Sequence, residues 1–348
     1  MQRCRVWQGS ILEKVDGDGA IIGINHFGRW RLPEALRALA RHGYRAVDYS
    51  AAAGRLAGDA DALATVRRLT RDLGLRPAAT HFRSFGFSFL APAERYQAFC
   101  HQSVEDVRVA AYLGAPAIAF HLGNDLGGGT DVAEHDPSRT RELPQRQGSR
   151  WRHRFEPVGG AVPAVETAGQ AGSRTLVEAL AAANAEALRP AVQVAEQEGV
   201  VVALENHCHG FGDRWEHLAA VADLLGSPAV GFTLDSGHAV VAGQDPARLA
   251  RQMGLRLALT HLHDNDGTAD THRPAGRSGP NGEQAGGAVV DWPALIRALQ
   301  EVRYPERNHW ILEGGTQVPG DDVDRLLAAH LASFSALLRS VANGMSRE

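Results

Sequence analysis

Short apolar segments alternate with longer segments of mixed polarity along most of this chain. Eight apolar runs have the length of β-strands, and uninterrupted apolar runs are typical of strands that are covered on both faces. These runs occupy residues 19–25, 44–50, 75–82, 115–123, 199–207, 229–238, 256–265 and 309–315. The pattern therefore predicts the buried strands of a parallel sheet.

The longer segments repeat their apolar residues at helical spacing. In residues 32–43, leucines three and four positions apart share one helix face, and Gly43 is a helix-stop signal. Asp59 is the expected N-cap of the following helix. Helical patterns occupy residues 32–43, 59–74, 175–199, 213–226, 245–254, 291–302 and 322–341.

The alternation of the two patterns predicts eight strand–helix units, which close into an α/β TIM barrel. The alternative is an open doubly wound sheet, but no GxGxxG loop follows the first strand. Residues 123–172 interrupt this alternation and contain three consecutive glycines, several prolines and six arginines. A connection of this length is typical of a lid, a binding loop or a solvated flexible loop. We expect residues 1–348 to form a single TIM-barrel domain with residues 123–172 inserted over its C-terminal face.

Composition narrows the classes of function. The chain has 348 residues, 44% of them hydrophobic, and a net charge of -4, which argues against non-specific nucleic-acid binding as its main role. Its only lysine, Lys14, precedes the first predicted strand, so neither a Schiff-base lysine nor a Walker A loop is expected. The three cysteines form no CxxC pair, and no apolar run is long enough to cross a bilayer. These features favour a reduced, cytoplasmic setting, and they leave open whether the chain forms a homo-oligomer.

The ends of the predicted strands are rich in side chains that bind metals or transfer protons. In a parallel barrel all these ends lie on one face, where the active site is built. The residues there are Asn25, His26, Asp48, His81, His121, Glu205, Asp235, His238, His261 and Glu313. Taken singly, a histidine at such a position is more often a hydrogen-bonded core residue, and an aspartate is often a helix N-cap.

Two of these residues are harder to explain as structural. Glu205 and Glu313 each follow an apolar run directly, and an unpaired carboxylate is costly in such a place. Together with Asp235 and His261 they form a set of oxygen and imidazole donors. Such a set favours Mn²⁺, Zn²⁺ or Co²⁺ over metals that prefer thiolates. The sequence therefore predicts a divalent metal site at the barrel mouth.

Residues 260–272, THLHDNDGTADTH, are the densest group of potential ligands. His261 ends the seventh strand and is the expected metal ligand. Strand alternation would turn His263 to the opposite face, which predicts a packing or hydrogen-bonding role. Asp264 and Asp266 are expected to shape the turn or to support the ligands from behind.

These motifs, taken in order, resemble those of the xylose isomerase-like TIM-barrel superfamily, which includes the sugar phosphate isomerase/epimerase family and the endonuclease IV class of DNA-repair enzymes. The resemblance covers about residues 20–341 apart from residues 123–172. It rests on LEN at Glu205, LDSGHA at Asp235 and His238, HLHDN at His261, DTH at Asp270 and His272, ILEGG at Glu313, and GGAVVDW before the seventh helix.

The resemblance implies a metal held by Glu205, Asp235, His261 and Glu313, with the two glutamates as the catalytic acid and base. The metal would bind the carbonyl and a neighbouring hydroxyl of a sugar, sugar phosphate or cyclitol-like polyol. One glutamate would remove the α-proton and the other would return it, through an enediolate. His238 would bind a substrate hydroxyl. These steps are those of a metal-dependent isomerase or epimerase.

The sequence also matches the larger, three-metal pattern of the endonuclease IV class. That pattern adds five potential ligands to the first four, and the number of ions per chain is therefore one to three. The added residues are His81, His121, His238, Asp270 and His272. The alternatives are accordingly a multinuclear phosphodiesterase and a lyase or dehydratase at the same metal site. A sugar-binding or regulatory barrel with a vestigial site is least favoured, because all nine ligand types are present.

Two positions depart from the epimerase pattern. Gly267 stands where many epimerases of the family carry an arginine, so substrate contact is left to Arg273, Arg277 or the insertion, with His81, His121 and His238 as further candidates. Asp48 stands where many carry a glutamate at the end of strand two. The expected partner is a small polyol or sugar, and a nucleic acid is disfavoured by the overall acidity and the scarcity of lysine.

Overall fold

The computed structural model describes residues 21–25, 31–84, 87–124, 176–276, 289–306, 308–314 and 323–345. Eight strands form one parallel sheet in the order β7-β6-β5-β4-β3-β2-β1-β8. They are β1 Ile22–Asn25, β2 Ala46–Asp48, β3 Arg76–His81, β4 Ala117–Phe120, β5 Val201–Glu205, β6 Val230–Asp235, β7 Leu257–His261 and β8 Trp310–Glu313. Each strand lies within a predicted apolar run, and the predicted TIM barrel is confirmed.

The sheet closes on itself at two seams. Strand β8 pairs with β1 over four residues, from Ile22 opposite Trp310 to Asn25 opposite Glu313. The last seam lies just beyond β7, where the Leu262 amide donates to the Ile311 carbonyl at 2.9 Å. The Glu313 amide in turn donates to the Leu262 carbonyl at 3.1 Å. These two hydrogen bonds join the first and last members of the strand order.

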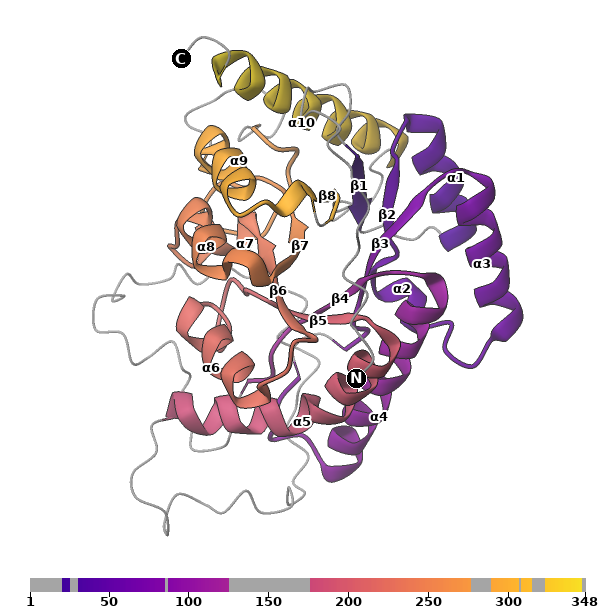
Figure 1. Cartoon of the computed structure of the whole chain (residues 1–348), viewed down its shortest axis with the longest axis vertical. Helices are drawn as coiled ribbons and strands as arrows, with labels where there is room; N and C mark the ends of the chain where they lie inside the picture. Colours follow the sequence, from indigo (N-terminus) through magenta and orange to yellow (C-terminus); the bar gives the residue numbers. More distant parts are fainter. Residues whose placement is uncertain are drawn as a thin grey trace, which may run out of the picture.

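Helices surround the strands and follow one another around the ring in sequence order, as the colours of Figure 1 show. The α-helices are α1 Leu32–His42, α2 Ser50–Gly54, α3 Ala60–Asp72, α4 Ala93–Leu113, α5 Leu176–Glu198, α6 Trp215–Leu225, α7 Ser236–Val241, α8 Pro246–Met253, α9 Trp292–Glu301 and α10 Val323–Met345. Two short 3₁₀ turns are η2 Gly254–Arg256 and η3 Tyr304–Glu306.

Local signals set several helix ends as predicted. Asp59 caps α3, because its side chain accepts a hydrogen bond from the Ala62 amide. Helix α1 ends at Gly43, whose φ of 88° lies in the left-handed region that favours glycine. Asp235, at the end of β6, caps α7 by accepting from the His238 amide. A single aspartate thus ends a strand and starts a helix at the barrel mouth.

The sequence patterns did not predict α4. Its buried face includes Ser103 and Asp106 among apolar residues, so the apolar periodicity is interrupted. Asp106 is only 1% exposed and pairs with Arg83, whose Nε donates to it at 2.7 Å. A buried ion pair here occupies a position that an apolar side chain would fill in a regular amphipathic helix.

The barrel interior is lined by small side chains below the polar strand ends. On β5, side-chain alternation puts Val201 and Ala203 on the same face as Glu205. On β8, Ile311 shares a face with Glu313 in the same way. Ala203 and Ile311 belong to a small apolar cluster, separate from the main core, that consists of Ala46, Ala78, Ala79, Ala119, Ala203, Leu259 and Ile311. Side-chain alternation therefore directs the carboxylates at the strand ends into the barrel mouth, next to this apolar cluster.

Most of the predicted insertion, residues 125–172, lies outside the described residues. None of the described helices combines the length and the hydropathy that crossing a membrane requires.

Candidate metal centre

Four consecutive strands bring four potential metal ligands together at the barrel mouth. Glu205, Asp235, His261 and Glu313 end β5, β6, β7 and β8, and each offers a ligand atom within 4.8 Å of the others. They are 1%, 0%, 0% and 8% exposed, respectively. The structure therefore brings together the four residues that the sequence assigned to the first metal.

His261 lies at the middle of this group. Its Nδ1 is 2.6 Å from Oε1 of Glu205 and 3.5 Å from Oε2 of Glu313. Its Nε2 faces the other way, 3.2 Å from Oδ2 of Asp48. Burial lowers the pKa of His261, but the carboxylates of Glu205 and Glu313 outweigh this effect and raise the pKa well above its usual value.

A second group of potential ligands shares Glu205. Nε2 of His81 and Nε2 of His121 lie 2.9 Å and 3.1 Å from Oε2 of Glu205. Oε1 of the same carboxylate faces His261. Burial opposes ionisation of Glu205, yet the neighbouring His261 and His121 hold its pKa well below the usual range. One carboxylate therefore connects two groups that could each hold a cation.

A third group lies beside α7. Oδ2 of Asp270 is 3.3 Å from Nε2 of His238 and 3.2 Å from Nε2 of His272. His272 adopts a φ of 47°, in the left-handed region that is unfavourable for a non-glycine residue. Backbone strain of this kind is typical of functional sites. The DTH motif thus folds back toward His238, as a third set of ligands would require.

The donor chemistry of these groups fits divalent metals, and a fourth group, made of His263, His272 and Glu313, overlaps the first and the third. Every donor is a carboxylate oxygen or an imidazole nitrogen, the set that suits Mn²⁺, Zn²⁺ and Co²⁺. A cation would also offset the cost of gathering carboxylates in a buried place. Burial is the main cause that raises the pKa of the Glu313 carboxyl above its usual value.

His263 lies on the metal side of the barrel wall, and the expectation that it faces away is wrong. The chain leaves the strand after His261, and Nε2 of His263 lies 3.0 Å from Oδ1 of Asp235. Burial lowers the pKa of His263, but Asp235 raises it to about 9 overall. The expected hydrogen-bonding role is confirmed. Its ring rests against Gly237, where an added Cβ would lie 2.0 Å from Cε1 of His263.

His207 is a further member of the site that the sequence did not indicate. Its ring centroid is 4.7 Å from that of His121 and 5.1 Å from that of His238. Burial lowers its pKa to about 3. The only signal in the sequence is its place two residues after Glu205, which is also consistent with an ordinary loop residue.

The two turn aspartates have the supporting roles predicted for them. Oδ2 of Asp264 accepts hydrogen bonds from Nε1 of Trp292 at 2.9 Å and from the Gly276 amide at 3.1 Å. Asp266 accepts from the Thr268 and Ala269 amides and so shapes the turn that follows.

Arg273 is held close to this turn. Its Nη2 donates to Oδ2 of Asp266 at 3.2 Å, and its backbone pairs with Asp264. Its proposed contact with substrate stays a prediction. Arg277 and His26 lie outside the described residues.

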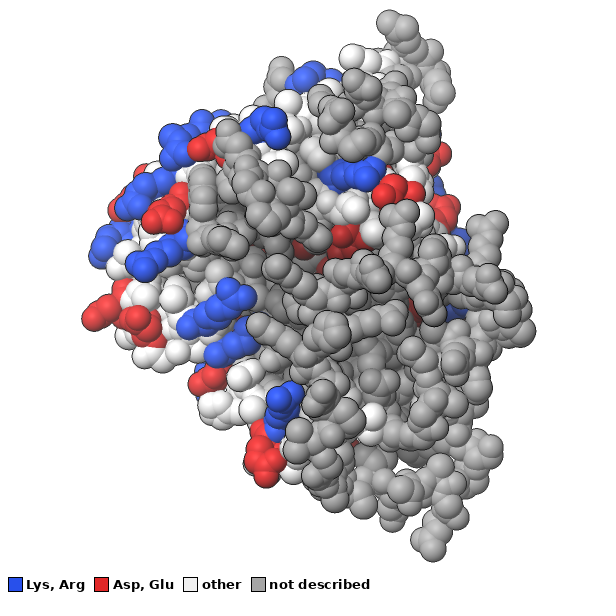
Figure 2. All heavy atoms as spheres, turned by 180° about the vertical axis from the view of Figure 1, so that it is seen from behind, with Lys and Arg blue, Asp and Glu red and all other residues white. Residues whose placement is uncertain are grey.

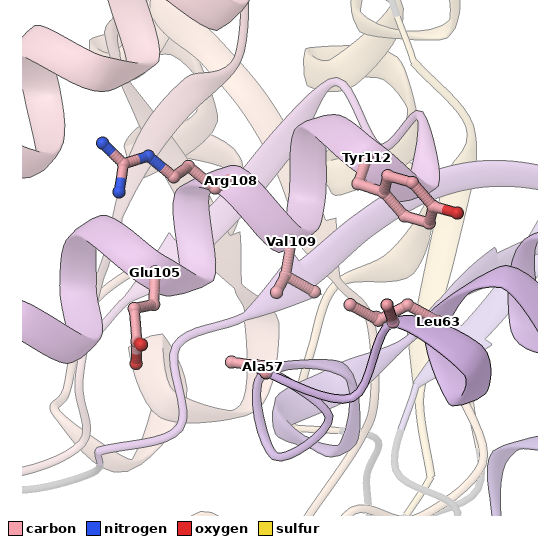
Figure 3. Close-up of a pocket in the computed structure, with 8 residues that line it drawn as sticks. Ala57, Leu63, Glu105, Arg108, Val109 and Tyr112 are labelled. Carbon is pink, nitrogen blue, oxygen red and sulfur yellow. The ribbon is translucent and has the colours of Figure 1, made fainter.

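A separate hollow lies on the outside of the barrel, between the α2–α3 loop and α4. Figure 3 shows Val109 and Tyr112 of α4 facing Leu63 and Ala57, with Glu105 further along the helix. This lining is mainly apolar, and it shares no residue with any of the ligand groups. The chemistry at the strand ends therefore belongs to a different part of the molecule.

Residues 36–331 match the family described as xylose isomerase-like TIM barrel. A curated relative, the uncharacterized protein MJ1311 of Methanocaldococcus jannaschii, is 33% identical over 127 residues. This match covers 35% of the chain, and the chain spans only 40% of the length of that relative.

Solved structures of similar fold include a D-tagatose 3-epimerase-like protein, with 15% identity, a TM-score of 0.63 and coverage of 93% of this chain and 99% of that one. L-ribulose 3-epimerase has 15% identity, a TM-score of 0.60 and coverage of 94% and 97%. 3-keto-D-glucoside 4-epimerase from E. coli has 14% identity, a TM-score of 0.59 and coverage of 92% and 99%. At these identities the similarity concerns the fold alone. Because the family match spans most of its length, the chain belongs to the xylose isomerase-like TIM barrel family.

Proposed function

We propose that this protein is a divalent-metal-dependent isomerase or epimerase that acts on a sugar, sugar phosphate or cyclitol-like polyol. The observation that carries the proposal is the pair of buried glutamates near Nδ1 of His261, with Asp235 completing the group. The family and the sugar epimerases of similar fold support the same class of reaction.

The proposed chemistry needs two groups that move protons on a bound substrate. Glu205 and Glu313 come from β5 and β8, and both reach into the barrel mouth. One glutamate removes the proton α to the substrate carbonyl, and the other returns a proton. Return to the opposite face of the same carbon gives epimerisation, and return to the neighbouring carbon gives aldose–ketose isomerisation.

A bound Mn²⁺, Zn²⁺ or Co²⁺ would supply Lewis acidity that stabilises the negative charge developing on the substrate oxygens. Glu205, Asp235, His261 and Glu313 would hold this ion. His238 is the proposed contact for a substrate hydroxyl, with His81, His121 and Arg273 as further candidates. Burial of the four ligands excludes bulk water from the place where the proton moves.

The test combines metal content with proton exchange. Purified protein is analysed for metals and then incubated in D₂O with a panel of ketoses and aldoses. Deuterium should enter the carbon α to the carbonyl in at least one sugar. The variants Glu205→Gln and Glu313→Gln should each lower the exchange rate by about 10²-fold or more while the fold remains intact.

Glu301→Gln is the matched control, because Glu301 lies on the outer helix α9 and pairs with the exposed Arg251. Near-normal turnover in Glu205→Gln or Glu313→Gln would overturn the proton-transfer roles. An absence of exchange across a broad panel of sugars would overturn the isomerase assignment. A lyase or dehydratase would be recognised by loss of water or by carbon–carbon cleavage in the products.

The second candidate is a phosphodiesterase of the endonuclease IV type, and the presence of several adjacent ligand groups favours it. Three ions could activate water and hold phosphate oxygens. However, Figure 2 shows basic and acidic residues interspersed over the described part of the surface that it draws, whereas binding a nucleic-acid backbone calls for a basic surface. Cleavage of a duplex that contains an abasic site, with Zn²⁺ present, would decide in favour of this candidate.

A further inference from the structure

Asp48 occupies an unusual position at the end of β2. Its side chain is fully buried, and the pairing of β2 with β3 shifts register between Val47 and Asp48. Its Oδ1 accepts a hydrogen bond from the Ser50 amide at 2.7 Å, and Ser50 has a left-handed φ of 55°. Its Oδ2 lies 3.2 Å from Nε2 of His261. Asp48 therefore contacts a proposed metal ligand although it belongs to none of the ligand groups.

The two nitrogens of His261 face different partners, and this division matters for metal binding. Nδ1 faces Glu205 and Glu313, and Nε2 faces Asp48. A neutral imidazole has one N–H and one lone pair, and it binds a metal only through the lone pair. Coordination through Nδ1 thus requires the proton to remain on Nε2.

We propose that Asp48 is a positioning residue for the metal site, which accepts the Nε2–H of His261 and so keeps the Nδ1 lone pair directed at Glu205 and Glu313. The proposal rests on the proposed metal site. A carboxylate behind a ligating histidine fixes both its tautomer and its ring orientation. The β2–β3 register shift and the Ser50 turn hold the short aspartate side chain at the required place.

A purely structural role for Asp48 is the competing explanation, because the residue also caps the Ser50 turn. An asparagine separates the two roles. The carboxylate accepts from two N–H groups, one on each oxygen, whereas an amide has one oxygen and one NH₂ group. If the amide oxygen stays with Ser50, the NH₂ group faces Nε2 of His261. The imidazole proton then moves to Nδ1 and removes the lone pair that the metal needs.

The experiment measures the affinity of the full-length protein for Zn²⁺ by competition with a chromophoric chelator. Asp48→Asn should bind Zn²⁺ about 10- to 100-fold more weakly than the unchanged protein. Asp48→Glu, which keeps two acceptor oxygens, should recover part of this loss. Asp59→Asn makes the same chemical change at the cap of α3 and should leave the affinity unchanged.

Nitrogen-15 NMR of histidine-labelled, Zn²⁺-loaded protein provides the second readout, with the His261 signals identified by their loss in His261→Gln. The His261 ring should be neutral with its proton on Nε2. A proton on Nδ1 in the unchanged protein would overturn the proposal, and this measurement does not require Asp48→Asn to fold. Equal Zn²⁺ affinity of Asp48→Asn and the unchanged protein would also overturn it. If the unchanged protein binds no divalent metal, the proposed metal site itself is wrong.

Discussion

Gly237 lies where the ring of His263 crosses the start of α7, and the substitution Gly237→Ala tests how tightly that ring is held. An added Cβ would lie 2.0 Å from Cε1 and 2.5 Å from Nδ1 of His263. Carbon atoms in contact are about 3.5–4.0 Å apart, so the ring would have to move by roughly 1.5 Å. The backbone at Gly237 does not have a positive φ, so the clash is with the ring and not with the backbone geometry.

The expected cost follows from two effects. Overpacking of a buried site destabilises a protein by about 1–3 kcal/mol. Displacement of the ring also breaks the 3.0 Å contact between His263 and Asp235, and an unsatisfied buried polar group adds about 1–3 kcal/mol. Alanine is favoured over glycine in a helix by about 1 kcal/mol, which offsets part of the sum. We expect Gly237→Ala to lower the free energy of unfolding by about 1–5 kcal/mol.

The assay is urea unfolding of metal-free protein in a double-mutant cycle with His263→Ala. Alanine at position 263 removes the ring, so Gly237→Ala in that background should be neutral or stabilising by up to about 1 kcal/mol. If Gly237→Ala costs the same with and without the His263 ring, the steric reasoning is wrong.

Three further predictions concern stability. Burial lowers the pKa of His330 to about 3, and neither ring nitrogen has a hydrogen-bond partner among the described residues. In the unfolded chain the His330 ring takes up a proton near pH 6.5, and in the folded chain it does not. The free energy of unfolding should therefore fall by about 1.4 kcal/mol per pH unit below 6.5. In His330→Leu, the free energy of unfolding, measured in urea at pH 7 and pH 5, should fall less with decreasing pH than in the unchanged protein. An equal fall in both proteins would contradict the burial argument. Asp264→Asn leaves one acceptor oxygen for several N–H donors, including Nε1 of Trp292, and should cost about 1–3 kcal/mol with a change in tryptophan fluorescence. Zn²⁺ at 100 times its Kd should stabilise the protein by about 2.7 kcal/mol, and the chelator EDTA should reverse this gain; identical melting curves in both conditions would exclude a metal bound only by the folded state.

The strands and most of the helices could be predicted from the sequence because their signals are local. Each strand is a run of apolar residues, and caps such as Asp59 act within one helical turn. The parallel arrangement then places Glu205 and Glu313 at one end of the barrel by side-chain alternation alone. The residues at the strand ends, and the chemistry that they could perform, could therefore be predicted from the sequence alone.

The missed features depend on contacts between distant segments. Helix α4 was not predicted because Asp106 pairs with Arg83 and interrupts its apolar face. The orientation of His263 depends on where the chain leaves β7 and on the space above Gly237. Asp48 meets His261 across 213 residues of sequence. The two-residue period of a strand and the 3.6-residue period of a helix carry no information on such distant pairs.

The seam at Leu262 links the closure of the barrel to the assembly of the metal centre. Leu262 separates His261 from His263, and its two backbone hydrogen bonds join β8 to the end of β7. This seam has few backbone hydrogen bonds, whereas β5 pairs with β4 and with β6 over four residues each, and elements with fewer such contacts open locally at a lower free energy. In metal-free protein, the amides of Leu262 and Glu313 should therefore exchange with solvent sooner than those of the inner strand β5. A cation that joins His261 to Glu313 would hold the two sides of this seam together, so metal uptake would report whether the seam between β7 and β8 is closed.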